Sequence, residues 1–508
     1  MYLTQSLHRS LQQHPERVAT VFAGRRRTFA EQAARVARLA GGLRGVGVQS
    51  GDRVGVLGLN SDRYLESYLA VPWADAVVVP VNTRWAPAEI AFSLRDSGTR
   101  VLIVDDTFAP LVPELRELTP ELGTVVHAGD GPSGADSASF EELAAGGAAI
   151  PDARRGDEEL AGIFYTGGTT GFPKGVMLSH RNLMIAALRN RAVTPGGCFL
   201  HVAPMFHLAD YHCTVSVCSS GGTHVIVPSV DPVGVLTAIA ENSITDLGLI
   251  PVILQMIVDN PALAEHDVSS VRSVAYGGSS ITVSVLERAK KAFPAAGFTQ
   301  VFGQTEAAPV LTRLGPEEHD DTNRPDLLRS AGRAMEHCEV LVVDPSGAEC
   351  PRGVQGEIVA RGGNVMLGYW NRPEETAAAL RDGWLHTGDA GVMDADGYLF
   401  VLDRIKDMIV TGGENVFSAE VENAIASHPA VAACAVIGLP DETWGERVHA
   451  VVVLHPGQHA EAEEITGHAR GFIGGYKIPR SVEFVDRLPV SAAGKVLKRE
   501  LREARRST

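Results

Sequence analysis

Residues Tyr165–Gly175 read YTGGTTGFPKG and continue an apolar segment, Gly162–Tyr165, that is typical of a buried strand. The glycines let backbone N–H groups crowd around a phosphate, the threonine hydroxyls donate to its oxygens, and Lys174 adds a positive charge. The phosphate loop of nucleoside triphosphatases requires Gly-Lys-Ser/Thr, whereas Lys174 is followed by Gly175. We therefore predict a phosphate-binding loop of another kind.

Helical and strand patterns alternate on both sides of this loop. The segment Thr28–Gly42 opens with the spacing of a capping box, and Asp52–Leu57 and Val77–Val81 are short apolar strands. Such alternation is typical of parallel strands covered by helices. The sequence therefore predicts layered α/β subdomains.

The pattern changes after Ser330, where short strands joined by turns indicate a small β-barrel-like subdomain. From Arg404 onward a compact segment has helices and strands of its own. We predict an α/β protein with a large N-terminal domain, residues 1–402, and a small α+β C-terminal domain, residues 403–508, which begins at Asp403.

The composition excludes several classes of protein. The 508 residues include 45 Lys and Arg against 61 Asp and Glu, and the net charge of −16 argues against nonspecific duplex binding. The start lacks the pattern of a signal peptide, and the longest apolar stretches are too short to span a membrane. The six cysteines show no CxxC spacing, which favours reduced thiols. We expect a cytoplasmic protein without nucleic-acid or integral membrane contacts, and homo-oligomerisation stays open.

The loop at Tyr165–Gly175 resembles the phosphate loop of the adenylate-forming superfamily, which includes acyl-CoA synthetases, luciferases and nonribosomal adenylation domains. That family usually has serine where this chain has Gly168, so one hydroxyl contact is missing. The resemblance continues, in the same order, through nearly the whole chain.

Gln300–Glu306, QVFGQTE, resembles the motif that surrounds the adenine and the metal. By this resemblance Phe302 stacks on adenine, Gln300 meets its polar edge, Thr305 contacts phosphate and Glu306 holds Mg²⁺. A carboxylate beside a triphosphate needs a divalent cation between them. Tyr276–Ser280 resembles the loop that borders the purine.

Trp384–Asp389 resembles the segment whose aspartate binds both ribose hydroxyls, and a carboxylate can accept both hydrogen bonds. Gly397–Asp407 resembles the hinge about which the small domain moves. Gly412–Val416 resembles the loop that turns toward the site for thioester formation, and Pro489–Lys498 resembles the motif of the catalytic lysine.

The resemblance implies a set of site residues. The ATP contacts are Thr166, Gly167, Gly168, Thr169, Thr170, Gly171, Lys174, Gly277, Gly278, Ser279, Gln300, Phe302, Gly303, Thr305, Asp389, Arg404 and Lys495. The catalytic residues are Lys495, Lys174, His207 and Glu306, the metal contacts are Glu306 and Thr170, and the hinge is Asp403. Beyond the resemblance, we predict an acyl pocket that includes His207, Asp210, Tyr211, Ile250, Leu254, Val301 and Gly303, and CoA contacts at Gly412, Gly413, Lys406, Tyr476 and Lys477.

The use of lysine supports some of these assignments independently. The chain has seven lysines against 38 arginines, and Lys174, Lys406, Lys477 and Lys495 lie in or beside glycine-rich segments. A compact ammonium fits a phosphate oxygen where a planar guanidinium does not. Chance clustering is the alternative.

Pro204–His207 resembles the segment that lines the acyl entrance. Relatives that act on plain alkyl chains tend to be apolar in the next segment, where this chain has Asp210 and His212. The two side chains suggest a polar or aromatic acid, with the alternative that both point away from the pocket.

We read Arg25–Arg27 as a surface turn, and His319–Asp321 as a solvated loop rather than a metal cluster because no second ligand group has a suitable spacing.

Together these features predict a carboxylic acid–CoA ligase that uses ATP, Mg²⁺ and CoA. The alternatives are an enzyme that loads a carrier protein, a luciferase-like oxygenase, or a catalytically silent nucleotide-binding protein. The sequence does not define the carboxylic acid.

Overall fold

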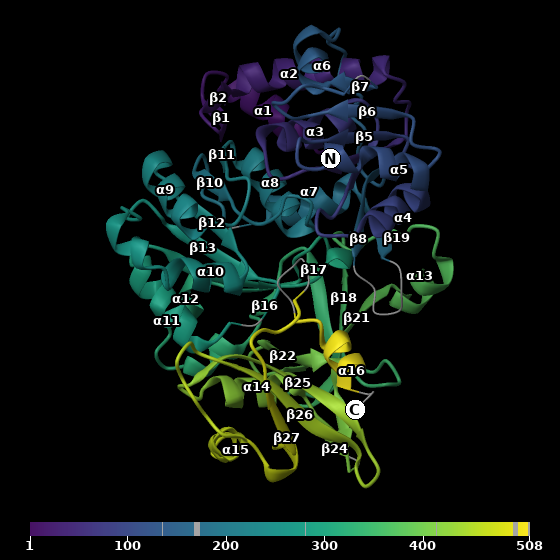
Figure 1. Ribbon diagram of the computed structural model, residues 1–508. Helices are drawn as coiled ribbons and strands as arrows, with labels where there is room; N and C mark the ends of the chain where they lie inside the picture. Colours follow the sequence, from purple (N-terminus) through teal and green to yellow (C-terminus); the bar gives the residue numbers. More distant parts are fainter. Residues whose placement is uncertain are drawn as a thin grey trace.

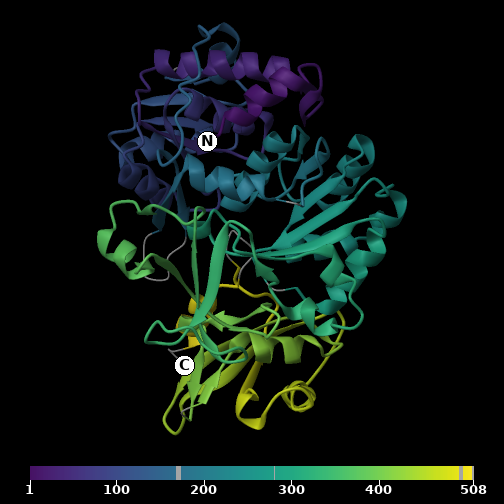
Figure 2. The ribbon, with the colours of Figure 1, turned by 180° about the vertical axis from the view of Figure 1, so that it is seen from behind.

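The computed structural model describes residues 1–134, 136–166, 173–190, 192–279, 281–412, 414–490 and 496–505. Figures 1 and 2 show layered sheets and helices in the N-terminal part and a smaller C-terminal unit at the opposite end of the molecule. In the described ranges, no helix is both long enough and apolar enough to cross a bilayer.

The first sheet has the order β19-β9-β8-β4-β3-β5-β6-β7, and its pairs are parallel except where β9 joins β8 and β19. Its strands are β3 (Arg53–Leu57), β4 (Val77–Pro80), β5 (Val101–Val104), β6 (Thr124–His127), β7 (Ser137–Ser139), β8 (Leu160–Thr166), β9 (Lys174–Ser179) and β19 (Gly368–Tyr369). The helices between them are α3 (Asp62–Trp73), α4 (Pro87–Ser97), α5 (Val112–Leu118) and α6 (Phe140–Gly146). The central strands β4 and β5 are wholly buried, which explains their unbroken apolar sequences.

The second sheet has the order β16-β15-β14-β13-β12-β10-β11-β1-β2. Its strands are β1 (Val18–Phe22), β2 (Arg25–Thr28), β10 (Cys198–His201), β11 (Thr223–Ile226), β12 (Asp246–Leu249), β13 (Ser273–Gly277), β14 (Gly297–Phe302), β15 (Thr312–Leu314) and β16 (Arg333–Ala334). The remaining helices of the N-terminal part before the antiparallel sheet are α1 (Gln5–Gln13), α2 (Phe29–Gly45), α7 (His180–Leu188), α8 (Leu208–Ser220), α9 (Pro232–Asn242), α10 (Pro251–Val258), α11 (Val283–Ala292) and α12 (Pro316–His319). The capping box predicted at Thr28 starts α2, where Thr28 accepts from the amide of Glu31.

An antiparallel sheet follows, as the short strands predicted. It is made of β17 (Cys338–Val343), β18 (Gln355–Gly362), β20 (Leu380–Arg381), β21 (Trp384–Met393) and β22 (Leu399–Arg404), with α13 (Pro373–Ala379) beside it. The α/β fold class that we predicted is confirmed.

The C-terminal sheet begins after β22 ends at Arg404, and it has a hydrophobic core of its own. It contains β23 (Ile409–Thr411), β24 (Glu414–Val416), β25 (Val431–Asp441), β26 (Gly445–Leu454) and β27 (Ser481–Phe484), with α14 (Ser418–Ala426), α15 (Ala462–Ala469) and α16 (Lys498–Arg505).

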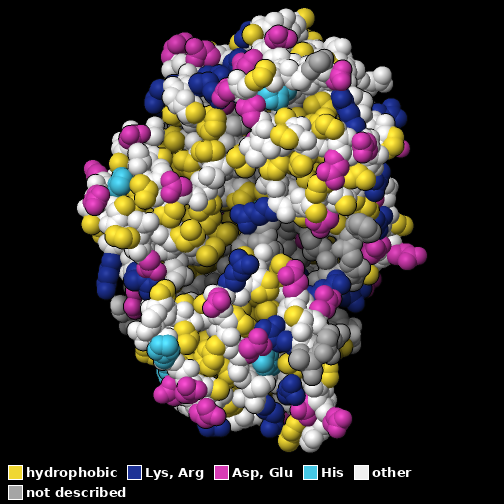
Figure 3. Space-filling model, viewed as in Figure 1, with side chains coloured by type: hydrophobic (Ala, Val, Ile, Leu, Met, Phe, Trp, Pro, Cys, Tyr) yellow, Lys and Arg dark blue, Asp and Glu magenta, His cyan; other side chains and the backbone are white. Residues whose placement is uncertain are grey.

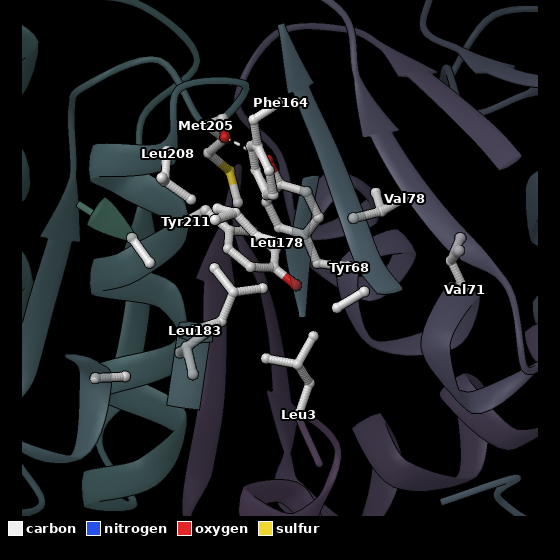
Figure 4. Packing of buried hydrophobic residues seen from close by; sticks show 14 of the residues in the cluster. Leu3, Tyr68, Val71, Val78, Phe164, Leu178, Leu183, Met205, Leu208 and Tyr211 are labelled. Atoms are coloured by element: carbon white, nitrogen blue, oxygen red, sulfur yellow. Dashed lines mark hydrogen bonds between the residues drawn. The ribbon is translucent and has the colours of Figure 1, made fainter. Parts of the chain in front are cut away.

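Aromatic side chains join the two large sheets (Figure 4). The rings of Tyr68 on α3 and Tyr211 on α8 meet edge to face, with centroids 4.3 Å apart, and the Tyr68 hydroxyl donates to the carbonyl of Met205. Phe164 on β8 packs against Tyr211 with a centroid distance of 5.2 Å. This contact fixes the segment that leads into α8 relative to the strand that leads into the phosphate loop.

Our interpretation of Arg25–Arg27 as a surface turn is wrong. These residues form β2, and Arg25 and Arg27 both pair with the buried carboxylate of Asp62. A carboxylate in this environment requires cationic partners, because an unpaired buried charge is strongly destabilising.

The interpretation of His319 as part of a solvated loop is wrong as well. His319 is buried, with Nδ1 2.7 Å from the carbonyl oxygen of Gly315 and Nε2 2.8 Å from the hydroxyl of Tyr276. Because Nδ1 faces a carbonyl, it carries the proton, and Nε2 accepts from Tyr276. His319 therefore anchors β13 to α12.

Candidate active site

Both arms of the predicted phosphate loop are linked to α4, β8 directly through Tyr165 and β9 through Trp370, whose amide donates to the carbonyl oxygen of Gly175. β8 ends at Thr166, which is the antiparallel partner of Lys174, the first residue of β9. Tyr165 donates to Asp96 Oδ2 at 2.7 Å, and Trp370 Nε1 donates to the carbonyl oxygen of Asp96 at 2.8 Å. The predicted contacts between the arms lie outside the described residues: Gly167, Gly168, Thr169, Thr170 and Gly171.

Lys174 and Glu306 meet the same tyrosine. Lys174 Nζ lies 5.0 Å from the centroid of the Tyr369 ring, and Tyr369 Oη donates to Glu306 Oε1 at 2.8 Å. Burial raises the pKa of Tyr369, as does the charge of Glu306, while the charge of Arg404 opposes them.

The sequence analysis missed Tyr369. Its partners Lys174 and Glu306 lie far away in the chain, 63 residues away in the case of Glu306. The dipeptide Gly368–Tyr369 forms β19, whose pairing with β9 brings the tyrosine to the site. No local pattern in the sequence predicts such a contact.

The adjacent strands β13 and β14 carry the predicted purine site. Gln300 is the parallel partner of Tyr276, and its Oε1 is buried without a hydrogen-bond partner in the described part of the chain. A buried acceptor without a hydrogen bond costs free energy, so a donor from a bound ligand is expected to complete it. The amino group of a purine is such a donor. A Cβ at Gly277 would lie 2.4 Å from the carbonyl oxygen of Val301, so a side chain there would force the strands apart.

Gly303 is similarly constrained where β14 turns toward Glu306. A Cβ on Gly303 would lie 2.0 Å from the carbonyl oxygen of Pro309. Asn364 donates to the carbonyls of Ala307 and Val310 and so holds the same turn. Thr305 and Glu306 begin the 3₁₀ turn in this segment, Thr305–Ala307, so their positions depend on the close backbone approach at Gly303.

Asp389 on β21 and Arg404 on β22 are cross-strand partners. Asp389 Oδ1 lies 2.7 Å from Arg404 Nε, with the two side chains 7% and 38% exposed. A carboxylate has two oxygens, so it can accept hydrogen bonds from both hydroxyls of a diol. The pair therefore fits the ribose role predicted for both residues.

The molecule is hollowed on one face between its N-terminal part and its C-terminal domain (Figure 3). Figure 3 shows basic side chains at the edge of the hollow. Among the described residues there is no group of three or more His, Cys, Asp or Glu side chains that could hold a metal ion. Of the two predicted metal contacts, Glu306 lies in the described part of the chain and Thr170 lies outside it.

The residues predicted to line the acyl pocket fall into two groups in the structure. His207 caps the start of α8, with its ring 4.3 Å from that of Phe206, and Ile250 lies beside Gly278. His212 is 6% exposed, and burial lowers its pKa to about 4, so the imidazole is neutral at pH 7.

Asp210, Tyr211 and Leu254 belong to the core, and we withdraw them from the pocket. Asp210 is 2% exposed, and its Oδ1 lies 2.9 Å from Nδ1 of the buried His201. His201 Nε2 lies 2.9 Å from His224 Nδ1, which completes a polar chain inside the second sheet. The sequence analysis did not find the contact between Asp210 and His201, because Asp210 lies on α8 and His201 on β10.

The hinge candidate Asp403 is tied to the C-terminal domain. Asp403 Oδ2 accepts hydrogen bonds from the amide of Ser418, at 2.6 Å, and from its hydroxyl. Lys498 contacts the same hydroxyl and pairs with Glu422 at 2.8 Å. The end of β22 is thus connected to α14 and to the start of α16.

The predicted CoA contacts lie on the C-terminal domain. The ring of Trp444 covers Gly412, whose amide donates to the carbonyl oxygen of Trp444 at 2.8 Å. Lys477 pairs with Glu420 at 2.7 Å, next to the exposed Tyr476. Lys406 lies in a 3₁₀ turn directly after β22, Ile405–Asp407.

Two further predictions, Gly413 and the catalytic Lys495, lie outside the described residues. Among the described residues on either side of Lys495, Val490 and Val496 form an antiparallel bridge, and the amide of Leu497 donates to the carbonyl oxygen of Pro489 at 2.8 Å.

Comparison with known proteins identifies the class. Residues 7–370 match the AMP-binding enzyme family, and residues 420–495 match the AMP-binding enzyme C-terminal domain. The chain therefore belongs to the AMP-binding, adenylate-forming enzymes, and the resemblance that we inferred from the motifs is confirmed.

Individual relatives cover the whole length of the chain. A feruloyl-CoA synthase of Amycolatopsis sp is 40% identical over 96% of this chain and 96% of its own. The fatty acid–[acyl-carrier-protein] ligase ScoC of Streptomyces coeruleorubidus is 34% identical over 98% and 95%. The structure of the anthranilate CoA ligase AuaEII in complex with anthranoyl-AMP superimposes with a TM-score of 0.92 at 29% identity, covering 99% of this chain and 97% of that one.

Proposed function

We propose that this chain is an ATP-dependent carboxylic acid–CoA ligase that acts on an aromatic acid. The observation that carries the proposal is that Tyr369 brings together Lys174 and Glu306, which are distant in the sequence, while Asp389 and Arg404 pair on neighbouring strands. The orphaned acceptor on Gln300 adds a purine contact. Identity to a feruloyl-CoA synthase and likeness to an anthranilate CoA ligase support the thioester product and the aromatic class.

In the first step a carboxylate oxygen attacks the α-phosphorus of ATP. The bond to the β-phosphate oxygen breaks, and pyrophosphate leaves with its electron pair, so an acyl-adenylate remains. Negative charge on the phosphate oxygens is stabilised by fixed cations, a role that we assign to Lys174 and Lys495. Mg²⁺, which Glu306 would hold, neutralises triphosphate charge when bound. Asp389 and Arg404 orient the nucleotide.

In the second step the sulfur of CoA attacks the acyl carbon. The carbon–oxygen bond to the phosphate breaks, AMP leaves, and the thiol proton passes to solvent. We propose that the C-terminal domain turns about Asp403 between the two steps and that Gly412, Trp444 and Tyr476 then lie along the path of CoA.

The acyl pocket in this proposal consists of His207, Ile250, Val301 and Gly303, together with His212. Burial lowers the pKa of His212 to about 4, so its imidazole is neutral at pH 7. A neutral imidazole offers no positive charge to a second carboxylate on the acid, and it therefore favours an acid with an uncharged aromatic ring. We also keep, as part of the proposal, a cytoplasmic location without a nucleic-acid partner.

The experiment is a panel of aryl, hydroxycinnamic and alkyl acids, each incubated with ATP and Mg²⁺ in the presence or absence of CoA. Release of AMP and formation of the thioester are followed by mass spectrometry. We expect acid-dependent thioester formation, strongest for an aromatic acid, and its loss in Glu306→Gln. Glu339→Gln, which changes an exposed glutamate paired with Arg361, is the matched control and keeps full activity.

The second candidate function is the loading of a carrier protein, which the 34% identity to ScoC favours. An acyl-adenylate that forms but is not consumed by CoA, and is consumed by a phosphopantetheinyl carrier protein, would replace our proposal with this one. Absence of any acid-dependent pyrophosphate release would instead indicate a silent nucleotide-binding protein.

A further inference from the structure

Tyr369 lies between two groups of opposite charge. The ammonium of Lys174 lies over the face of its ring, with Nζ 5.0 Å from the centroid, and its hydroxyl donates to Glu306 Oε1 at 2.8 Å. In the described part of the chain, the second oxygen of Glu306, Oε2, accepts no hydrogen bond. Lys174 and Glu306 thus share a neutral partner rather than pairing with each other.

The main chain holds the tyrosine in this position from both sides. The amide of Met366 donates to the carbonyl oxygen of Glu306 at 2.9 Å, and the amide of Trp370 donates to that of Gly175 at 2.7 Å. The amide of Tyr369 itself donates to Thr376 Oγ1 at 2.9 Å. The short segment from Met366 to Trp370 therefore joins the backbone that carries Glu306 to the backbone that carries Lys174.

We propose that Tyr369 is a positioning residue that keeps Lys174 and Glu306 apart, so that both charges stay available to the triphosphate and its cation. A direct Lys–Glu ion pair would neutralise both groups. The hydroxyl of Tyr369 donates a hydrogen bond to one oxygen of Glu306 without adding a charge, and its ring stabilises the ammonium of Lys174 by a cation–π contact. The inference rests on the proposed function in that it takes ATP and Mg²⁺ as the ligands of this site.

The two contacts of Tyr369 can be removed separately. Tyr369→Phe keeps the ring under Lys174 and removes the hydroxyl that orients Glu306, whereas Tyr369→Leu removes both. Tyr64→Phe is the matched control, because it deletes another buried tyrosine hydroxyl, one that donates to the carbonyl of Val56 at 3.4 Å.

Binding of α,β-methylene-ATP, which is not cleaved, is measured by calorimetry with excess Mg²⁺ and again with EDTA. For Tyr369→Phe we expect about tenfold weaker binding with Mg²⁺, the usual effect of losing a hydrogen bond to a charged group, and unchanged binding in EDTA. Tyr369→Leu should bind more weakly under both conditions, and Tyr64→Phe should match the wild type throughout.

A merely structural role would lower binding of Tyr369→Phe equally with Mg²⁺ and EDTA, and that result overturns the inference. Unchanged binding of Tyr369→Phe under both conditions overturns it too. The measurement requires neither CoA nor the carboxylic acid. Failure to form a thioester would therefore refute the proposed function alone, whereas a wild type that ignores Mg²⁺ would refute the metal role of Glu306 and this inference together.

Discussion

Replacing Asp389 with asparagine tests the proposed nucleotide site most directly. Asparagine is nearly the same size as aspartate, so it fits a side chain that is 7% exposed between β21 and β22. It removes the negative charge and replaces one acceptor oxygen with a donor group. If Asp389 accepts hydrogen bonds from both ribose hydroxyls, Asp389→Asn loses one of them and weakens the other.

The size of the effect follows from the two interactions that change. A hydrogen bond to a charged group contributes about 1.5–3 kcal/mol, which corresponds to roughly 10- to 100-fold in affinity. The ion pair with Arg404 also disappears, but Arg404 is 38% exposed, and such a screened pair contributes less than about 1 kcal/mol. We therefore expect ATP to bind about 10- to 100-fold more weakly, mainly through the ribose contact.

The assay compares ATP with 2′,3′-dideoxy-ATP by calorimetry in the wild type and in Asp389→Asn. The wild type should lose about 10- to 100-fold in affinity when the diol is missing. The variant should lose little more, because two changes that delete the same contact are not additive. Asp326→Asn, at an exposed aspartate paired with Arg324, serves as the control and should behave as the wild type.

Equal discrimination between the two nucleotides by the variant and the wild type would refute the reasoning. Asp389 would then have no contact with the diol, and weaker ATP binding in the variant would reflect displacement of Arg404.

Three further changes test other parts of the site. Lys495→Ala should slow adenylation by about 10²–10³-fold and spare thioester formation from supplied acyl-adenylate. The two half-reactions are measured by rapid quench. An equal loss of rate in both would contradict a lysine that leaves the site between the steps. Gly303→Ala should destabilise the fold by about 1–3 kcal/mol and weaken ATP binding, because its Cβ would lie 2.0 Å from a carbonyl oxygen. The control Gly467→Ala should do neither, because the space around Gly467 is open. Equal melting temperatures for the two variants would argue against this constraint. Asp403→Ala should leave the buried amide of Ser418 without its acceptor, at a cost of about 1–3 kcal/mol, and speed hydrogen exchange in residues 404–418. Unchanged exchange would mean that this contact does not hold the end of β22 against α14.

The predictions that succeeded rest on local sequence. Helix capping at Thr28, the buried strands β4 and β5 and the β-rich region after Ser330 follow from residues that are near neighbours in the chain. The motifs around Lys174, Glu306 and Asp389 are short contiguous segments, so the family could be identified without coordinates.

The predictions that failed concern polar side chains whose partners are distant in the chain. Asp210 follows His207 closely in sequence and was assigned to the same pocket, yet its carboxylate binds His201 inside the second sheet. Arg25 and Arg27 look like a charged surface turn until α3 places Asp62 beside them. An isolated polar residue has the same appearance in sequence whether it faces solvent or a buried partner.

The sequence by itself pointed to the residues that we propose for the chemistry: a glycine-rich loop with one lysine, a carboxylate for a cation and another for a ribose. Only the tertiary structure decided which side chains lie beside these charged groups. Tyr369 reaches Glu306 across 63 residues because β19 pairs with β9, and Arg404 reaches Asp389 because β22 pairs with β21. Strand pairing is set by the burial of apolar faces over the whole chain, and no short motif encodes it.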